Sequence, residues 1–160
     1  MKNKDEIYAV LMKLAGDTLL LPNSAVAEVV SAERMQAAPG GSPAWLAGTI
    51  SHSERRLPVL RFEVLNGGLQ ADDSRRLRVA ILHGITERLR SGQYAVLCHG
   101  YPHLVTLNRQ ALKKEPAVVT DRKGLVLSRV KIANTTALIP NLEMMEAELA
   151  DLESVSGEAP

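Results

Sequence analysis

Apolar residues recur at every second position along much of the chain, a pattern that is typical of half-buried β-strands. The pattern predicts short strands at residues 7–14, 18–21, 45–50, 57–60, 77–82, 94–99, 104–107, 125–132 and 135–139. Turn-forming pairs such as Gly16-Asp17 and Lys123-Gly124 separate neighbouring runs. Eight or nine strands at this close spacing, with two or three short helices, indicate a mainly all-β barrel or sandwich rather than a parallel α/β sheet.

Two segments have the spacing of short helices instead. The first follows Pro22-Asn23 and places Val26, Val29 and Val30 three and four residues apart. The second begins after residue 141 and carries an apolar stripe made of Leu142, Met145, Leu149 and Leu152.

The boundaries of the domain follow from composition. Asn66-Gly67-Gly68 and the polar residues after it predict a linker near residues 66–75. The tripeptide at residues 21–23, Leu-Pro-Asn, is echoed by Ile-Pro-Asn at 139–141, which suggests two related lobes. We expect one domain over residues 1–152 and a flexible acidic tail over 153–160. Pro58 has no amide hydrogen, so we expect it either in a strand at the edge of a sheet or at the first position of a strand.

The amino-acid composition adds two facts to this picture: the number of cysteines and the distribution of charge along the chain. The chain has 160 residues, and its one cysteine, Cys98, excludes an intrachain disulfide and fits a reducing compartment. Six acidic residues and no basic residue lie in 141–160, so the body of the protein is basic. The longest uncharged stretch, residues 35–53, contains Pro39, two glycines and Pro43, which argues against a spanning helix. A cytoplasmic protein is therefore expected.

Motifs that carry chemistry are missing from the sequence. Neither a G-x-G-x-x-G turn, nor a P-loop, nor a G-x-S-x-G elbow occurs. Cys98, His99 and His103 resemble metal ligands only superficially, because adjacent residues of a strand point to opposite faces. The same geometry argues against a Cys98–His99 catalytic pair. We therefore predict no catalytic residues, no metal and no cofactor.

Clusters of basic residues leave one alternative open, a small β-barrel that binds nucleic acid or a ligand. Arg55-Arg56 and Arg75-Arg76 are two such clusters. Single-stranded nucleic acid needs exposed aromatic platforms, and only five aromatic residues occur, most of them in apolar strands. We therefore expect these charges to be solvated and expect no nucleic-acid partner.

The stretch from Pro43 to Val59 resembles the signature of the CheW-like domain family. Pro43, Trp45 and Gly48 have the spacing of that signature, and Pro58-Val59 matches its Pro-Val strand. Upstream, Val26-x-Glu28-Val29 is similar to the V-x-E-[IV] motif at the family's first helix. The resemblance extends over residues 7–152 by the order and spacing of the elements.

This resemblance implies two five-stranded, SH3-like β-barrel lobes that share an apolar interface, with the C-terminal helix closing the first lobe. It also implies a non-catalytic adaptor that couples the cytoplasmic tips of chemoreceptors to the regulatory domain of a CheA-type histidine kinase. Other CheW-like proteins are further partners that it implies. Direct membrane insertion is not expected.

Polar positions of the family pattern differ in this chain. The Asn-Leu-Arg-Gly turn of the family is Ser51-His52-Ser53-Glu54, so serine replaces an arginine fork and glutamate replaces glycine. We expect from Glu54 that this turn no longer needs a positive φ. Arg61 and His99 each stand where the family has aspartate. These differences suggest an accessory member, for example one serving pilus-based twitching motility.

The residues expected to bind partners come from the two matching stretches. They are Val26, Glu28, Ser53, Glu54 and Arg55. Each has an ordinary alternative role: Val26 could belong to the core, and residues 53–55 could form a solvated turn. The residues expected to be structural are Pro43, Trp45, Gly48, Pro58 and Val59.

Overall fold

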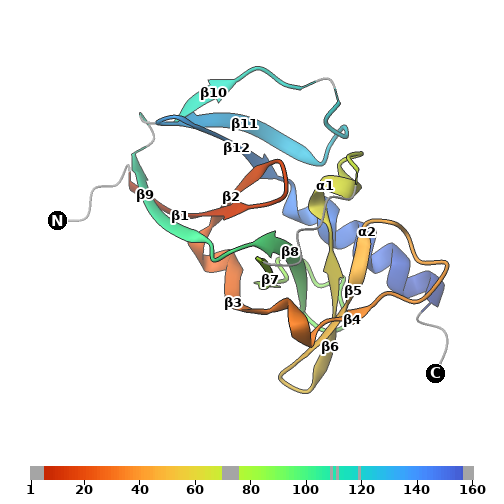
Figure 1. Ribbon diagram of the computed structural model, residues 1–160. Coiled ribbons are helices and arrows are strands. Elements are labelled where there is room, and N and C mark those ends of the chain that lie inside the picture. Colours follow the sequence, from red (N-terminus) through yellow and green to blue (C-terminus); the bar gives the residue numbers. More distant parts are fainter. Residues whose placement is uncertain (1–5, 70–75, 109, 111, 119, 157–160) are drawn as a thin grey trace.

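Two β-sheets form two lobes that share one chain (Figure 1). The computed structural model describes residues 6–69, 76–108, 110, 112–118 and 120–156. Lobe 1 has the strand order β10(Lys113–Glu115), β11(Val126–Ile132), β12(Thr135–Pro140), β2(Thr18–Pro22), β1(Glu6–Lys13), β9(His103–Asn108). Lobe 2 has the order β3(Val26–Ser31), β7(Leu77–His83), β8(Gln93–His99), β6(Arg55–Leu60), β5(Leu46–His52), β4(Gln36–Ala37).

The all-β, two-lobe plan predicted from the sequence is confirmed, with six strands in each sheet instead of five. The shortest strands, β4 and β10, have two and three residues, too few for an alternating pattern to reveal. The chain enters lobe 2 after β2 and returns to lobe 1 at β9, so lobe 2 is inserted into lobe 1. Short helices complete the described fold: η1(Asn23–Ala25), η2(Ala32–Arg34), α1(Phe62–Leu65) and α2(Leu142–Ser156).

The predicted helix after Pro22 is wrong beyond its first turn. Only Asn23–Ala25 is helical, as a 3-10 turn, and Val26–Ser31 is a strand paired antiparallel with β7. β-Branched valines fit a pleated surface well, and the pairing with β7 satisfies backbone groups that a lone helix turn would leave open. The valine spacing suits either structure, and tertiary pairing decides between them.

Three smaller expectations also need correction. The strand of Pro58 is not at a sheet edge, because β6 lies between β5 and β8; Pro58 simply precedes the first residue that pairs with β8, Val59. Residues 153–156 of the predicted tail continue α2, and residues 157–160 lie outside the described part of the chain. The repeated Pro-Asn tripeptides do not mark one lobe each. They end β2 and β12, which are parallel neighbours within lobe 1.

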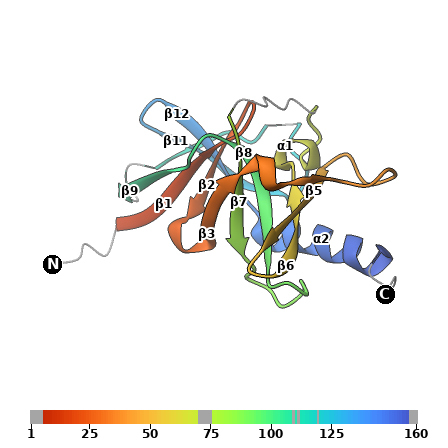
Figure 2. The same ribbon diagram turned by 60° about the horizontal axis from the view of Figure 1, so that its bottom comes forward.

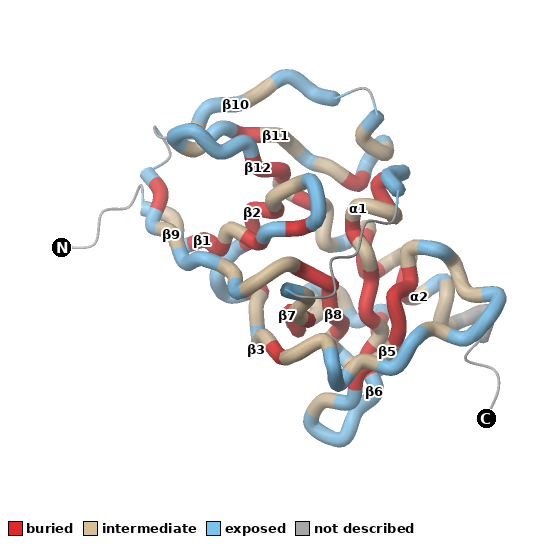
Figure 3. Tube along the Cα trace, in the orientation of Figure 1, coloured by how far each residue is buried: buried red, intermediate tan, exposed pale blue. Residues whose placement is uncertain are grey.

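One apolar cluster joins both lobes and α2, and it contains the largest buried side chains. Buried segments converge between the lobes and along α2 in Figure 3. Lobe 1 contributes Met12 and Leu19, lobe 2 contributes Leu82 and Tyr94, and α2 contributes Met145. We call this cluster the shared core. Each lobe also has a smaller cluster of its own, so α2 packs on a core that belongs to both lobes and does not simply close the first.

A buried carboxylate fixes α2 against lobe 2, and Figure 2 shows the helix running along that lobe. Glu146 has no exposed surface. Its Oε2 accepts from the Ile85 amide at 2.9 Å, and its Oε1 accepts from the Thr86 amide at 2.9 Å and the Thr86 hydroxyl at 2.7 Å. The Tyr94 hydroxyl nearby has no partner among the described residues, and burial, with the Glu146 charge second, raises the pKa of Tyr94. Three donors on one carboxylate compensate its desolvation.

We predict that Glu146→Gln lowers the free energy of unfolding by about 1–3 kcal/mol. The amide has one acceptor oxygen where the carboxylate has two, so an N–H donor of the 85–86 loop would face another N–H donor. Chemical denaturation monitored by circular dichroism measures the change. The exposed neighbour Glu143→Gln is the matched control and should change stability by less than about 0.5 kcal/mol. Equal stabilities of the two variants would contradict the role of this carboxylate.

Candidate functional site

Glu28 and the 53–55 turn, four of the five residues expected to bind partners, come together at one end of lobe 2. Nε2 of His52, beside the β5–β6 turn, lies 3.4 Å from Oε2 of Glu28 on β3. The Arg34 guanidinium donates to the Ser51 carbonyl at 3.0 Å. β3 and β5 are not neighbours in the sheet, so these contacts require the sheet to curl until the two strands approach. Glu28 and the 53–55 turn are therefore parts of one surface.

The exposure of this surface differs from residue to residue. Glu28, Ser53, Glu54 and Arg55 are exposed, and Val26 is half-buried against the shared core. Arg55 donates to the Ser91 carbonyl at 2.6 Å, which ties the turn to the loop before β8. We call Val26, Glu28 and residues 53–55 the β3-turn surface.

The turn in this surface has a left-handed backbone, contrary to the expectation from its sequence. Ser53 has φ 49° and Glu54 has φ 65°. His52 pairs with Arg55, so the loop has two residues, and two positive φ values correspond to a type I′ turn. The twist of the hairpin sets this geometry, and without Asn or Gly the sequence gives no signal for it. Glycine has been replaced while the backbone conformation that favours it persists.

The residues expected to be structural lie in the strands of this hairpin or in the segment just before it. A Cβ on Gly48 would lie 2.0 Å from the Gln36 carbonyl oxygen, so glycine is needed there for the close approach of β4. Val59 is fully buried and pairs with Ala95 of β8. The Pro43 carbonyl accepts from Leu46, and the Trp45 carbonyl accepts from Arg61 at 2.7 Å.

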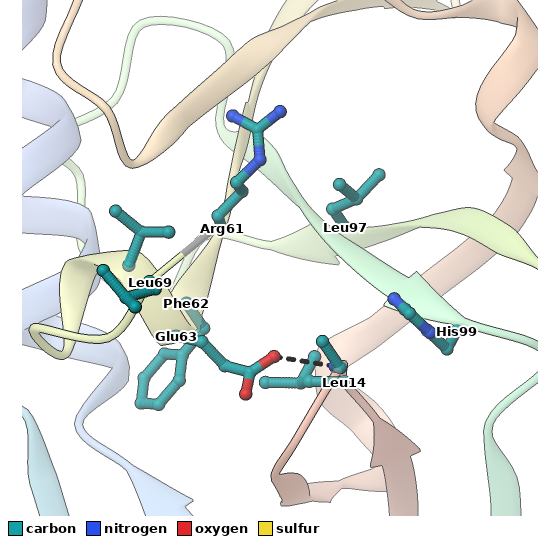
Figure 4. Close-up of a pocket in the computed structure, with 9 residues that line it drawn as sticks. Leu14, Arg61, Phe62, Glu63, Leu69, Leu97 and His99 are labelled. Carbon is teal, nitrogen blue, oxygen red and sulfur yellow. Dashed lines mark hydrogen bonds between the residues drawn. The ribbon is translucent and has the colours of Figure 1, made fainter. Parts of the chain in front are cut away.

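A carboxylate on α1 joins the two lobes at a second place, shown in Figure 4. Glu63 accepts from the Ala15 amide at 2.7 Å and from the Gly16 amide at 2.8 Å, both in the β1–β2 turn of lobe 1. The small cavity beside it, about 20 Å³, is lined by Leu14, Phe62 and His99 among others. It has room for roughly one water molecule and not for a substrate.

A third junction is built around Asp121, in the loop before β11. Its carboxylate receives two hydrogen bonds from the Arg129 guanidinium, each 2.7 Å, and one from the Asn66 amide group at 2.9 Å. Arg129 also lies 3.7 Å from Asp17, and its side chain is mostly enclosed. The bonds from Arg129, above all, lower the pKa of Asp121. Asn66 follows α1, so the network joins the lobes.

The two replaced aspartates occupy different surroundings. Arg61 is half-buried and lies within 3.5 Å of the carbonyls of Ala44 and Leu46, so its charge is directed at backbone dipoles. His99 is half-exposed at the rim of a cleft that also contains Lys13 and Arg76.

Cys98 and His99, the adjacent pair considered above for metal binding and catalysis, have different surroundings. Cys98 is buried, and burial raises its pKa to about 12, so the thiol stays protonated at neutral pH. Its Sγ is 3.7 Å from the Gly100 carbonyl, while His99 is half-exposed. Among the described residues, no group of three His, Cys, Asp or Glu side chains could hold a metal ion. Within the same residues, every helix is too short or too polar to cross a bilayer.

We predict that Glu54→Gly raises the free energy of unfolding by about 1 kcal/mol, since glycine adopts a positive φ without the Cβ strain of glutamate. Thermal and urea unfolding measure the gain. Lys131→Gly, in the exposed part of β11, is the control and should destabilise by about 0.5–1 kcal/mol because its backbone is extended. A loss of stability in Glu54→Gly would show that the glutamate side chain stabilises the turn.

We predict that the stability difference between wild type and Asp121→Asn depends on pH. The folded pKa of Asp121 is lowered, so its contribution is complete above the unfolded value of about 3.9 and is lost as pH falls through the folded pKa. Urea unfolding of both proteins from neutral pH down to about pH 3 should therefore give converging free energies. A difference that stays constant over this range would contradict the ionised contact.

Comparisons with known proteins agree with the fold. The scaffolding protein TtCheW from Thermoanaerobacter tengcongensis has a similar structure, with a TM-score of 0.68 and 18% sequence identity over 85% of this chain and 89% of that chain. No curated protein matches the chain. The family model of the CheW-like domain matches residues 9–148, which is most of the sequence. The chain therefore belongs to the CheW-like domain family.

Proposed function

We propose that this protein is a scaffold of chemotaxis signalling that couples chemoreceptors to a CheA-type histidine kinase, using the β3-turn surface to bind a partner. Family membership supports the scaffolding role. The observation that carries the choice of surface is the His52–Glu28 contact, which unites two stretches that the sequence separates by more than twenty residues. The protein works in this role by binding and not by catalysis.

The chemistry of the β3-turn surface suits protein recognition. Partner surfaces combine an apolar patch with a polar rim. Half-buried Val26 supplies the apolar part, and Glu28, Glu54 and Arg55 supply charges of both signs around it. Oppositely charged groups at a rim favour one orientation of the partner and disfavour mismatched surfaces.

The partners that we propose are the regulatory domain of the kinase and the cytoplasmic tip of a receptor, with other CheW-like proteins in addition. The cytoplasm is the compartment in which these contacts are made. Ser53 and Glu54 replace an arginine and a glycine of the family turn, and Arg61 replaces an aspartate. A partner adapted to this altered charge pattern belongs to a dedicated pathway, for which pilus-based motility is our candidate.

We predict that the purified protein binds the regulatory domain of at least one CheA-type kinase of its host, and that Glu28→Lys weakens this binding about tenfold. The substitution removes the contact with His52 and places a positive charge beside this imidazole instead of a negative one. Biolayer interferometry with each kinase domain and each receptor tip of the host measures the affinities.

Glu6→Lys in lobe 1 is the matched control, since Glu6 is exposed and lies outside the β3-turn surface. Its affinity should equal that of the wild type. The proposed coupling would be refuted if the wild type bound none of the kinase domains and none of the receptor tips. Equal weakening by both charge reversals would refute the choice of surface, because only general electrostatics would then be at work.

A further inference from the structure

A large open groove lies on lobe 2, apart from the lobe junction. Its walls are the outer side of the β5–β6 hairpin, the loop at residues 39–43 and the C-terminal half of α2. Its volume is about 980 Å³. Clefts of roughly 300–1,000 Å³ hold drug-sized ligands, so this groove has room for several side chains of a peptide.

The lining of the groove is largely apolar. Half-buried Leu152 and three prolines, at positions 39, 43 and 58, supply the accessible apolar surface, whereas Leu46 and Leu149 are buried members of the lining. Thr49 and Pro58 are paired across the hairpin and are both half-buried, so this part of the wall is regular sheet. Proline-rich, hydrogen-bonded walls hold their shape before a ligand arrives, which lowers the entropic cost of binding.

Three arginines, Arg55, Arg56 and Arg90, stand at the edge of this apolar lining, and all three are exposed. Arg55 donates to a backbone carbonyl, and Arg56 donates to the Gln36 side-chain amide, so these two bonds leave both positive charges uncompensated. The single acidic residue of the lining is Glu153, whose carboxylate is 3.4 Å from the Arg90 amide. The groove therefore combines apolar side chains with the positive charges of Arg55 and Arg56, which outnumber the single negative charge of Glu153.

We propose that this groove binds an acidic amphipathic peptide segment of a partner protein. Leucine-like side chains of the segment would pack against Leu152 and the prolines, and its carboxylates would accept charge-assisted hydrogen bonds from Arg55 and Arg56. Glu153 repels acid at one end, which favours one direction of the segment. Among the described residues that line the groove, none is aromatic and able to stack on a base, and phosphates would make no use of the apolar lining. A peptide therefore fits better than a nucleic acid.

This groove is distinct from the coupling role proposed above, although Arg55 borders both surfaces. Its residues come from lobe 2 and α2, whereas Val26 and Glu28 of the β3-turn surface are absent from its lining. Arg56 and Arg90 line the groove without belonging to the β3-turn surface, so substitutions there separate the two proposals.

The test titrates the full chain into a fluorescein-labelled peptide of repeated Glu-Leu-Glu-Glu-Leu-Leu units and follows fluorescence anisotropy. We expect saturable binding that weakens about tenfold in Arg56→Glu, because this reversal replaces attraction by repulsion. Arg88→Glu is the matched control, exposed and outside the lining, and should bind as the wild type does. Far-ultraviolet circular dichroism verifies that each variant is folded.

Two further probes make the result specific. A peptide with Lys in place of Glu, and one with Ser in place of Leu, should each bind at least about tenfold more weakly. In amide spectra of the labelled protein, shifts should concentrate at residues 39–58 and 149–153. Binding of the Lys peptide as tight as that of the Glu peptide, or equal losses in Arg56→Glu and Arg88→Glu, would overturn the proposal. The affinity of the Arg56→Glu variant for the kinase domain should equal that of the wild type. Failure of the groove proposal can therefore be distinguished from failure of the coupling proposal.

Discussion

The shared core fixes the positions of the two lobes and α2 relative to one another, and therefore the positions of the surfaces that they carry. Met12, Tyr94 and Met145 come from the two lobes and α2 and are buried in one cluster. Separating the lobes would expose this cluster to water, at a cost of roughly 25 cal/mol for each Å² of apolar surface. The Glu63 carboxylate and the Asp121 network add directional contacts across the same junction. A scaffold needs its binding surfaces at fixed relative positions, and this apolar contact between lobes supplies that rigidity.

Much of the fold could be predicted from the alternation of apolar and polar residues. The nine predicted strand runs all contain or overlap strands of the structure, and the α2 stripe of Met145 and Leu149 is buried as expected. The spacing of Pro43, Trp45 and Gly48 is a sequence feature of the family to which the chain belongs. These features are predictable because burial along a strand or helix depends on local periodicity, which the sequence contains directly.

Other features depend on contacts that the sequence does not contain. The valines at 26–30 suit a helix or a strand, and pairing with β7 makes them a strand. The positive φ at Ser53 and Glu54 comes from hairpin twist rather than from residue preference. The Glu146 contacts with residues 85–86, and the groove between the β5–β6 hairpin and α2, join segments that are at least sixty residues apart. A local periodic pattern contains no information about such long-range contacts.

The turn at Ser53 and Glu54 shows which part of this fold tolerates change. Non-glycine residues in the left-handed region carry local strain, which persists only where surrounding structure fixes the backbone. Here the pairing of His52 with Arg55 and the close approach of β4 at Gly48 provide that constraint. The backbone of the hairpin is therefore set by the sheet, and the side chains at its tip are free to differ in charge. Under the proposed role of this tip in partner binding, its charge can change while the fold is kept, because the two properties depend on different residues.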